Sequence, residues 1–164
     1  MKALLIPHRV RVVALGCIDD RLVSSQARHL HRLGGGFLSA MAGGAAAILT
    51  ERDQESALGQ ITDAYGVTPY LKVILRLHLG CGKLAGLCAE DGELHGQVDP
   101  TSSYDLYRFG DRAIEPVRAA LRKAHNVEVP IEVEVYDIVP GRRRFWLFGR
   151  RLPTDRFVSR WEAK

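Results

Sequence analysis

The sequence has no apolar segment approaching the roughly 20 residues that a membrane-spanning helix requires. Its opening, MKALLIPHRV, is interrupted by Pro7 and His8 too soon for the apolar region of a secretory signal. Cysteine is scarce as well, and the three residues form an odd, scattered set that argues against a disulfide framework (Cys17, Cys81 and Cys88). We therefore expect a cytoplasmic protein with no membrane partner, whose thiols are free to bind a metal.

The sequence also lacks internal repeats, low-complexity tracts and a strong excess of one charge. A formal net charge of +4 over 164 residues is too small to identify nucleic acid or another anion as the partner. Hydrophobic residues make up 46% and charged residues 26%, which is typical of a soluble globular protein with a substantial core. We expect one domain over residues 1–164.

Short β-branched runs and longer amphipathic runs indicate the fold class. Residues 10–15 (VRVVAL) and 71–77 (LKVILRL) have the composition of buried strands. Apolar periodicity predicts helices over 53–65 and 104–125. Residues 131–139 (IEVEVYDIV) alternate apolar and charged side chains, which predicts a strand with one face in water. These elements predict an α/β protein with a central, mostly parallel β-sheet flanked by helices.

The pattern is weaker between the first strand and the helix predicted over 53–65. The sequence ARHLHRL predicts a turn or two of helix, in which His29 and His31 diverge and are expected to be solvated or capping residues. A glycine-rich loop and an alanine-rich stretch follow. The expected order in this half is strand, helix, loop, helix, strand.

Metal-binding residues follow both predicted strands. Cys17 comes after the first strand, and His78 and Cys81 come after the second. Ligands of open parallel sheets bind outside the carboxyl ends of the strands, so these residues can meet in space. Two thiolates and one imidazole suit tetrahedral Zn²⁺, and three protein ligands leave one position open for water. Cys88 can close that position, but its apolar helical surroundings favour core packing.

Asp19 and Arg21 lie immediately after the first of these cysteines. Beside a bound metal, the Asp19 carboxylate can accept a hydrogen bond from zinc-bound hydroxide. Arg21 can hold that carboxylate through a charge-assisted hydrogen bond. If the metal is present, the two residues can therefore orient the hydroxide bound to it.

The pair of motifs Cys17-x-Asp19-x-Arg21 and His78-x-x-Cys81-Gly82 resembles the signature of the β-class carbonic anhydrases. The segments LKVILRLHLGCG and VEVPIEVEVYDIVPGRR resemble the family's second strand with its metal loop and its late strand and turn. The resemblance implies a β-carbonic anhydrase-like fold and zinc held by the two cysteines and the histidine.

The same resemblance implies reversible hydration of carbon dioxide to bicarbonate by zinc-bound hydroxide, oriented by Asp19 and Arg21. It also implies a homodimer or higher homo-oligomer with its active sites at a subunit interface. In a second state known for the family, the aspartate itself takes the fourth zinc position, and the sequence leaves open whether Asp19 does so.

Two features depart from the family pattern. The family has an Arg-Asn-Ala-Gly segment between its metal motifs, and the nearest counterpart here is Arg32-Leu33-Gly34-Gly35-Gly36, which lacks the asparagine. We expect Gly34, Gly35 and Gly36 to line the substrate pocket together with Gly82. Because the first predicted strand starts within about ten residues, we expect no helical arm of the kind that often embraces a partner subunit, and a dimer held together differently.

Other functions remain open. Related folds hydrolyse carbon disulfide or carbonyl sulfide, which are linear molecules like carbon dioxide. A non-catalytic zinc-stabilised binding module is a further alternative. Residues 142–164 combine arginines with aromatic side chains, a pattern that can bind single-stranded nucleic acid, but an arm packed on the body or on a second subunit is favoured.

Overall fold

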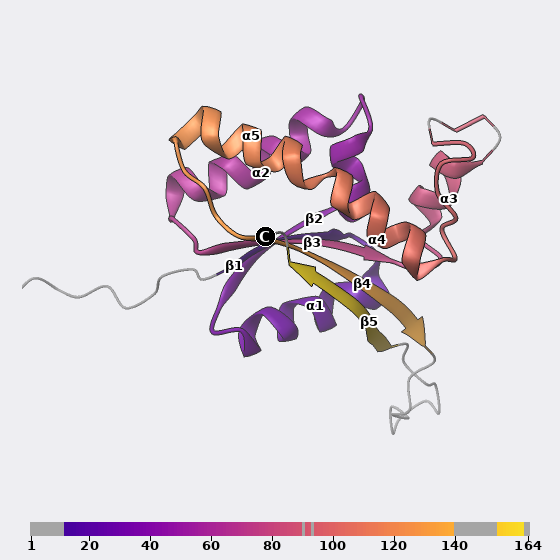
Figure 1. Cartoon of the computed structure of the whole chain (residues 1–164). Coiled ribbons are helices and arrows are strands. Elements are labelled where there is room, and N and C mark those ends of the chain that lie inside the picture. Colours follow the sequence, from indigo (N-terminus) through magenta and orange to yellow (C-terminus); the bar gives the residue numbers. More distant parts are fainter. Residues whose placement is uncertain (1–11, 90, 93, 140–153, 163–164) are drawn as a thin grey trace, which may run out of the picture.

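A five-stranded sheet forms the centre of the molecule (Figure 1). The computed structural model describes residues 12–89, 91–92, 94–139 and 154–162, with only the backbone described for residues 20–25, 139 and 154–162. The strands are β1 (Val12–Cys17), β2 (Gly36–Met41), β3 (Lys72–His78), β4 (Ile131–Val139) and β5 (Thr154–Glu162). Their order is β2-β1-β3-β4-β5, with β1 to β4 parallel and β5 antiparallel to β4. The predicted α/β class with a mostly parallel sheet is confirmed.

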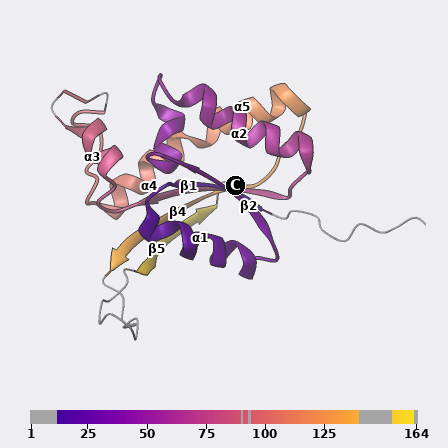
Figure 2. The ribbon, with the colours of Figure 1, turned by 180° about the vertical axis from the view of Figure 1, so that it is seen from behind.

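Helices cover both faces of this sheet (Figures 1 and 2). The helices are α1 (Asp20–Arg32), the short 3-10 helix η1 (Gly44–Leu49), α2 (Gln54–Val67), α3 (Gly82–Cys88), α4 (Ser103–Arg112) and α5 (Ile114–His125). Helix α1 lies on one face, whereas α2, α4 and α5 lie on the other. Helix α3 follows the end of β3, so it stands at the edge where the parallel strands end.

Two element predictions were wrong. Strand β2 was not expected, because its sequence GFLSAM has few of the β-branched residues that identify a strand. The helix predicted over 104–125 is two helices that meet at Ala113. Pro116 explains the break, because its ring would clash with the carbonyl of Arg112 in a continuous helix.

The two faces of the sheet are packed with different kinds of side chain. Toward α2, α4 and α5, alternate strand residues such as Leu15, Leu75 and Val133 join one large apolar cluster. Toward α1, the apolar cluster is small and centres on Ile74, and buried charged side chains occupy much of the remaining face.

The predicted wet face of the strand over 131–139 is therefore wrong. Glu132 and Glu134 are buried, at 2% and 0% exposure, because cations on the neighbouring strand β3 pair with them. Lys72 pairs with Glu132, and Arg76 Nε donates to Glu134 Oε2 over 3.0 Å. The charged residues of β4 are thus buried in the interior, where cationic side chains of the adjacent strand pair with them.

Candidate metal centre

Three predicted ligands meet where β1 and β3 end. Cys17 is the last residue of β1, His78 is the last residue of β3, and Cys81 directly precedes α3. Because β1 and β3 are adjacent and parallel, their carboxyl ends lie together. The candidate ligand atoms all lie within 4.8 Å of one another, and all three residues are buried. Residues distant in sequence thus form one compact Cys-His-Cys cluster.

The spacing of the sulfur atoms fits a tetrahedral metal. The two Sγ atoms are 3.9 Å apart. Two thiolates bound to one zinc ion, each at about 2.3 Å and at a tetrahedral angle, lie about 3.8 Å apart. The cluster therefore has the size of a zinc site.

His78 is also oriented as a ligand. Its Nδ1 lies 3.1 Å from the backbone oxygen of Leu79, which fixes the ring and makes Nδ1 the protonated nitrogen. Its Nε2 is buried and has no hydrogen-bond partner among the described residues. A lone pair buried without a partner is unfavourable, so the geometry leaves Nε2 for a metal.

The two thiols differ in acidity because they share one proton. The Cys81 thiol is the largest cause that lowers the pKa of Cys17, which falls to about 4 despite burial, and the backbone N–H groups of Asp19 and Gly43 act in the same direction. The neighbouring thiolate and burial raise the pKa of Cys81. One thiolate is therefore ready for a cation in the metal-free protein.

The remaining cysteine lies outside this cluster. Cys88 ends α3, is half-buried and packs against the large apolar cluster. This is the core role that the sequence favoured. Within the described part of the chain, no fourth cysteine, histidine or carboxylate joins the three ligands as a metal group.

Asp19 and Arg21 lie on the connection from β1 into α1. Asp19 is half-buried, and its backbone N–H points to the Cys17 sulfur. Arg21 is in the first turn of α1, and its side chain is outside the described residues. The predicted contact between the two side chains stays a prediction. Gly82 opens α3 immediately after Cys81.

The structure does not bring Gly34, Gly35 and Gly36 to the cluster. Gly36 pairs with Val12, at the start of β1, whereas Cys17 at its end pairs with Met41. Five residues of strand separate these positions by about 17 Å. The expectation that these three glycines line the pocket is thus corrected by the strand register.

Another glycine, Gly44, approaches the Cys-His-Cys cluster. A Cβ on Gly44 would lie 2.5 Å from the backbone oxygen of Arg76 and 3.0 Å from the nitrogen of Cys17. Gly44 also has a φ of +58°, which L side chains rarely adopt. Sequence reasoning missed this close approach, although the pair Gly43-Gly44 before the alanine run was a signal for it.

A buried polar network lies beneath the cluster on the α1 side. Glu134 accepts hydrogen bonds from Arg76 and, over 2.6 Å, from the Tyr136 hydroxyl. His29 of α1 places Nε2 3.6 Å from the other oxygen of Glu134. His29 was expected to be a solvated or capping residue; it lies in the last turn of α1 and is partly exposed, but it also faces a buried carboxylate on β4, which was not expected. His31 is exposed, as expected.

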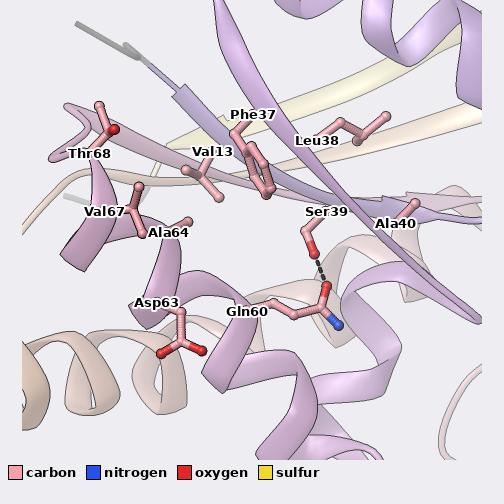
Figure 3. A pocket seen from close by; sticks show the side chains of 10 residues that line it. All are labelled: Val13, Phe37, Leu38, Ser39, Ala40, Gln60, Asp63, Ala64, Val67 and Thr68. Atoms are coloured by element: carbon pink, nitrogen blue, oxygen red, sulfur yellow. Dashed lines mark hydrogen bonds between the residues drawn. The ribbon is translucent and has the colours of Figure 1, made fainter.

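An open groove lies elsewhere on the molecule. A groove of about 480 Å³ lies between β2 and α2, and apolar residues such as Phe37, Leu38 and Val67 form most of its wall (Figure 3). Across it, the Ser39 hydroxyl donates to Gln60 Oε1. Phe37 is 51% and Val67 is 84% exposed. This groove lies beside β2, which is one of the two edge strands of the described sheet.

Comparisons with known proteins identify the fold. No family model and no curated protein matches the sequence. The β-carbonic anhydrase CafA of Aspergillus fumigatus is 15% identical, with a TM-score of 0.52 over 82% of this chain and 74% of that one. A carbonic anhydrase from Glaciozyma antarctica is 22% identical, with a TM-score of 0.46 over 92% of this chain and 85% of that one. The first likeness shows that the chain has a β-carbonic anhydrase-like fold.

No helix in the described part of the chain is both long and apolar enough to cross a bilayer.

Proposed function

We propose that this protein is a zinc-dependent carbonic anhydrase that interconverts carbon dioxide and bicarbonate. The observation that carries the proposal is the buried Cys17, His78 and Cys81 cluster, with ligand atoms within 4.8 Å. It stands at the carboxyl ends of adjacent parallel strands, where α/β sheets place their ligands. The β-carbonic anhydrase-like fold supports the same reading.

In this proposal Cys17, His78 and Cys81 would hold a zinc ion, and three protein ligands would leave one position for water. A bound zinc ion supplies Lewis acidity, which lowers the pKa of a coordinated water toward neutrality. The unpartnered Nε2 of His78 is the nitrogen ligand, since Nδ1 is held by the Leu79 carbonyl.

The remaining roles belong to residues around this cluster. Asp19 accepts a hydrogen bond from the reacting water and turns its lone pair toward carbon dioxide. Arg21 holds the Asp19 carboxylate. Gly82, with no side chain, leaves space beside Cys81 for the small substrate.

We further propose that two copies associate through β2, in the cytoplasm. An edge strand presents unpaired backbone groups, and here an open apolar groove lies beside it. Exposed Phe37 lies on this strand. A second copy covers the groove, so Phe37→Glu is expected to shift the protein toward monomer in analytical ultracentrifugation. A monomeric wild-type chain contradicts this assignment.

Zinc content tests the metal centre first. Purified wild-type protein is expected to hold one equivalent of zinc, and Cys17→Ser to lose it. Cys88→Ser is the matched control, because Cys88 is a thiol outside the cluster. Loss of zinc from Cys88→Ser would instead favour a closed, four-ligand site in a non-catalytic module.

Stopped-flow hydration of carbon dioxide by zinc-loaded protein tests the activity. Asp19→Asn is expected to reduce kcat/KM about 10–100-fold, because the amide no longer offers a carboxylate to orient the reacting water beside the metal. Glu115→Gln, at an exposed carboxylate of α5 outside both the metal site and the groove beside β2, is the control and should leave the rate unchanged. No rate above buffer in the zinc-loaded wild type would overturn the enzymatic proposal.

The same preparation separates the alternative functions. Faster turnover of carbon disulfide or carbonyl sulfide than of carbon dioxide would reassign the substrate. Salt-dependent binding of single-stranded nucleic acid without any turnover would identify a binding module.

A further inference from the structure

A second, much smaller cavity adjoins the metal cluster on the α1 side of the sheet. Its volume is about 10 Å³, and it is lined by Cys17, Gln26, Arg76, Leu77, His78 and Tyr136. Two of these are proposed metal ligands, whereas Cys81 does not border it. The volume is at the lower limit for one water molecule and far too small for an organic ligand.

Two residues in the wall of this cavity have buried polar atoms without partners among the described residues. These atoms are Nη2 of Arg76 and Oε1 of Gln26, and the residues are 2% and 3% exposed. Nη2 is a charged donor and Oε1 is an acceptor. Leaving either unsatisfied in the interior costs about 1–3 kcal/mol, more for the charged group. A water that bridged the two atoms would satisfy both.

The other polar atoms of these two residues tie the cavity to the metal ligands. Gln26 Nε2 donates to the backbone oxygen of Cys17 over 3.3 Å. Arg76 Nη1 donates to the backbone oxygen of Gln26 over 3.4 Å, and Arg76 Nε is held by Glu134. Helix α1, strand β1 and strand β3 are therefore joined immediately behind the cluster.

Gly16 is part of the same arrangement. A Cβ at Gly16 would lie 1.9 Å from Gln26 Oε1. The absence of a side chain before Cys17 thus admits the Gln26 amide, which reaches across β1 to the Cys17 carbonyl.

We propose that this cavity is a single-water site, and that Arg76 and Gln26 are positioning residues for the metal centre. The water accepts a hydrogen bond from Arg76 Nη2 and donates one to Gln26 Oε1. Together they fix the end of β1, which carries Cys17, and the ring of His78 that borders the site. This inference rests on the proposed function only in taking zinc as the metal.

A crystal structure of the zinc-loaded protein tests the water directly. An ordered water within hydrogen-bond distance of both Arg76 Nη2 and Gln26 Oε1 is expected. An empty cavity, or an Arg76 guanidinium that turns away from it, would overturn the proposal.

Zinc affinity, measured by competition with a chromophoric chelator, tests the positioning role. Gln26→Met keeps the side-chain volume but removes the amide, and is expected to weaken zinc binding about 10–100-fold. The double variant Arg76→Met with Glu134→Gln removes both charges of the buried pair, so that no unpaired ion remains, and should weaken zinc binding to a similar extent.

The chain offers a matched control on the same two strands. Lys72 and Glu132 form a second β3–β4 ion pair, at the opposite end of β3 from His78. Lys72→Met with Glu132→Gln is expected to leave zinc affinity within about threefold of wild type. Equal weakening by both double variants would show a general loss of stability, and no weakening by Gln26→Met would remove the positioning role.

The absorption spectrum of the cobalt-substituted protein adds a readout that stability alone does not move. Gln26→Met should shift the ligand-field bands, because the Cys17 and His78 ligands change their geometry. An unchanged spectrum would count against the proposal. Zinc affinity that responds as expected in a protein without carbon dioxide hydration would overturn the proposed function and leave this inference standing.

Discussion

The two faces of the sheet differ in what holds them together. Toward α2, α4 and α5 the strands contribute aliphatic side chains, whereas toward α1 they contribute two cross-strand ion pairs and a small apolar cluster. The Cys-His-Cys cluster contains residues from both faces. Cys17 continues the alternation of Val13 and Leu15 into the large apolar cluster, whereas His78 has the same strand parity as Arg76. A metal here bridges the apolar and the polar layer.

The largest expected effect concerns the acidity of the ligand from the apolar face. Burial alone would raise the pKa of Cys17, but hydrogen bonds led by that of Cys81 lower it to about 4. A lowered pKa of an acid keeps its charged form at lower pH. The metal-free protein should therefore show the ultraviolet absorbance of one thiolate, disappearing only near pH 4.

Two variants sharpen this measurement. Cys17→Ser should remove the low-pH thiolate, and Cys88→Ser should retain it. A first thiolate that forms only near the ordinary pKa of cysteine would mean that the hydrogen bond from Cys81 does not lower the pKa of Cys17.

The next largest effect tests the polar face. Glu134→Ala leaves the Arg76 guanidinium buried and unpaired, which is expected to reduce the free energy of unfolding by about 3–5 kcal/mol. Arg76→Met with Glu134→Gln should recover most of this loss, since it removes both charges. Urea unfolding of the three proteins measures the difference, and a double variant as unstable as the single one would contradict it.

The apolar face has no such compensation. Leu75→Ala, at a fully buried position, should reduce the free energy of unfolding by about 2–4 kcal/mol through lost burial and a cavity. Leu71→Ala is the control, because Leu71 is 57% exposed. It should change the unfolding free energy by no more than about 0.5 kcal/mol. Similar losses in both would show that this face is not the packed core.

The smallest effect concerns the backbone beside the metal cluster. Gly44→Ala forces a Cβ against the Arg76 carbonyl and should destabilise the protein by about 1–3 kcal/mol. Gly59→Ala, in α2 with open space around its Cα, should be neutral or stabilising by up to about 1 kcal/mol. Thermal unfolding of both variants measures the difference in stability. Equal unfolding midpoints would contradict the close approach of the backbone at Gly44.

Sequence reasoning reached the parts of the molecule that depend on local pattern. The strands containing Leu15, Leu75 and Val133 and the fold class follow from β-branched runs and their order. The meeting of Cys17, His78 and Cys81 followed from a rule for parallel sheets combined with a family resemblance. Each of these signals lies within a short segment or a pair of motifs.

The errors share a physical cause, which is that the partner lies on another element. Glu134 was expected in water because alternation does not reveal Arg76 on the adjacent strand. Gly36 was wrongly placed at the site because the sequence does not reveal the register that pairs it with the start of β1. The contact of His29 with Glu134 was missed for the same reason, since only the folded sheet sets a carboxylate beside its helix.

The separation of the two cysteines along the chain has a consequence for how the molecule assembles. Cys17 and Cys81 are 64 positions apart, so their sulfur atoms come together only after β3 has docked beside β1. A metal ion held by both sulfurs would therefore be retained only after that docking. In that case metal uptake would be a late step of folding, and the ion would stabilise only chains whose central strands have already paired.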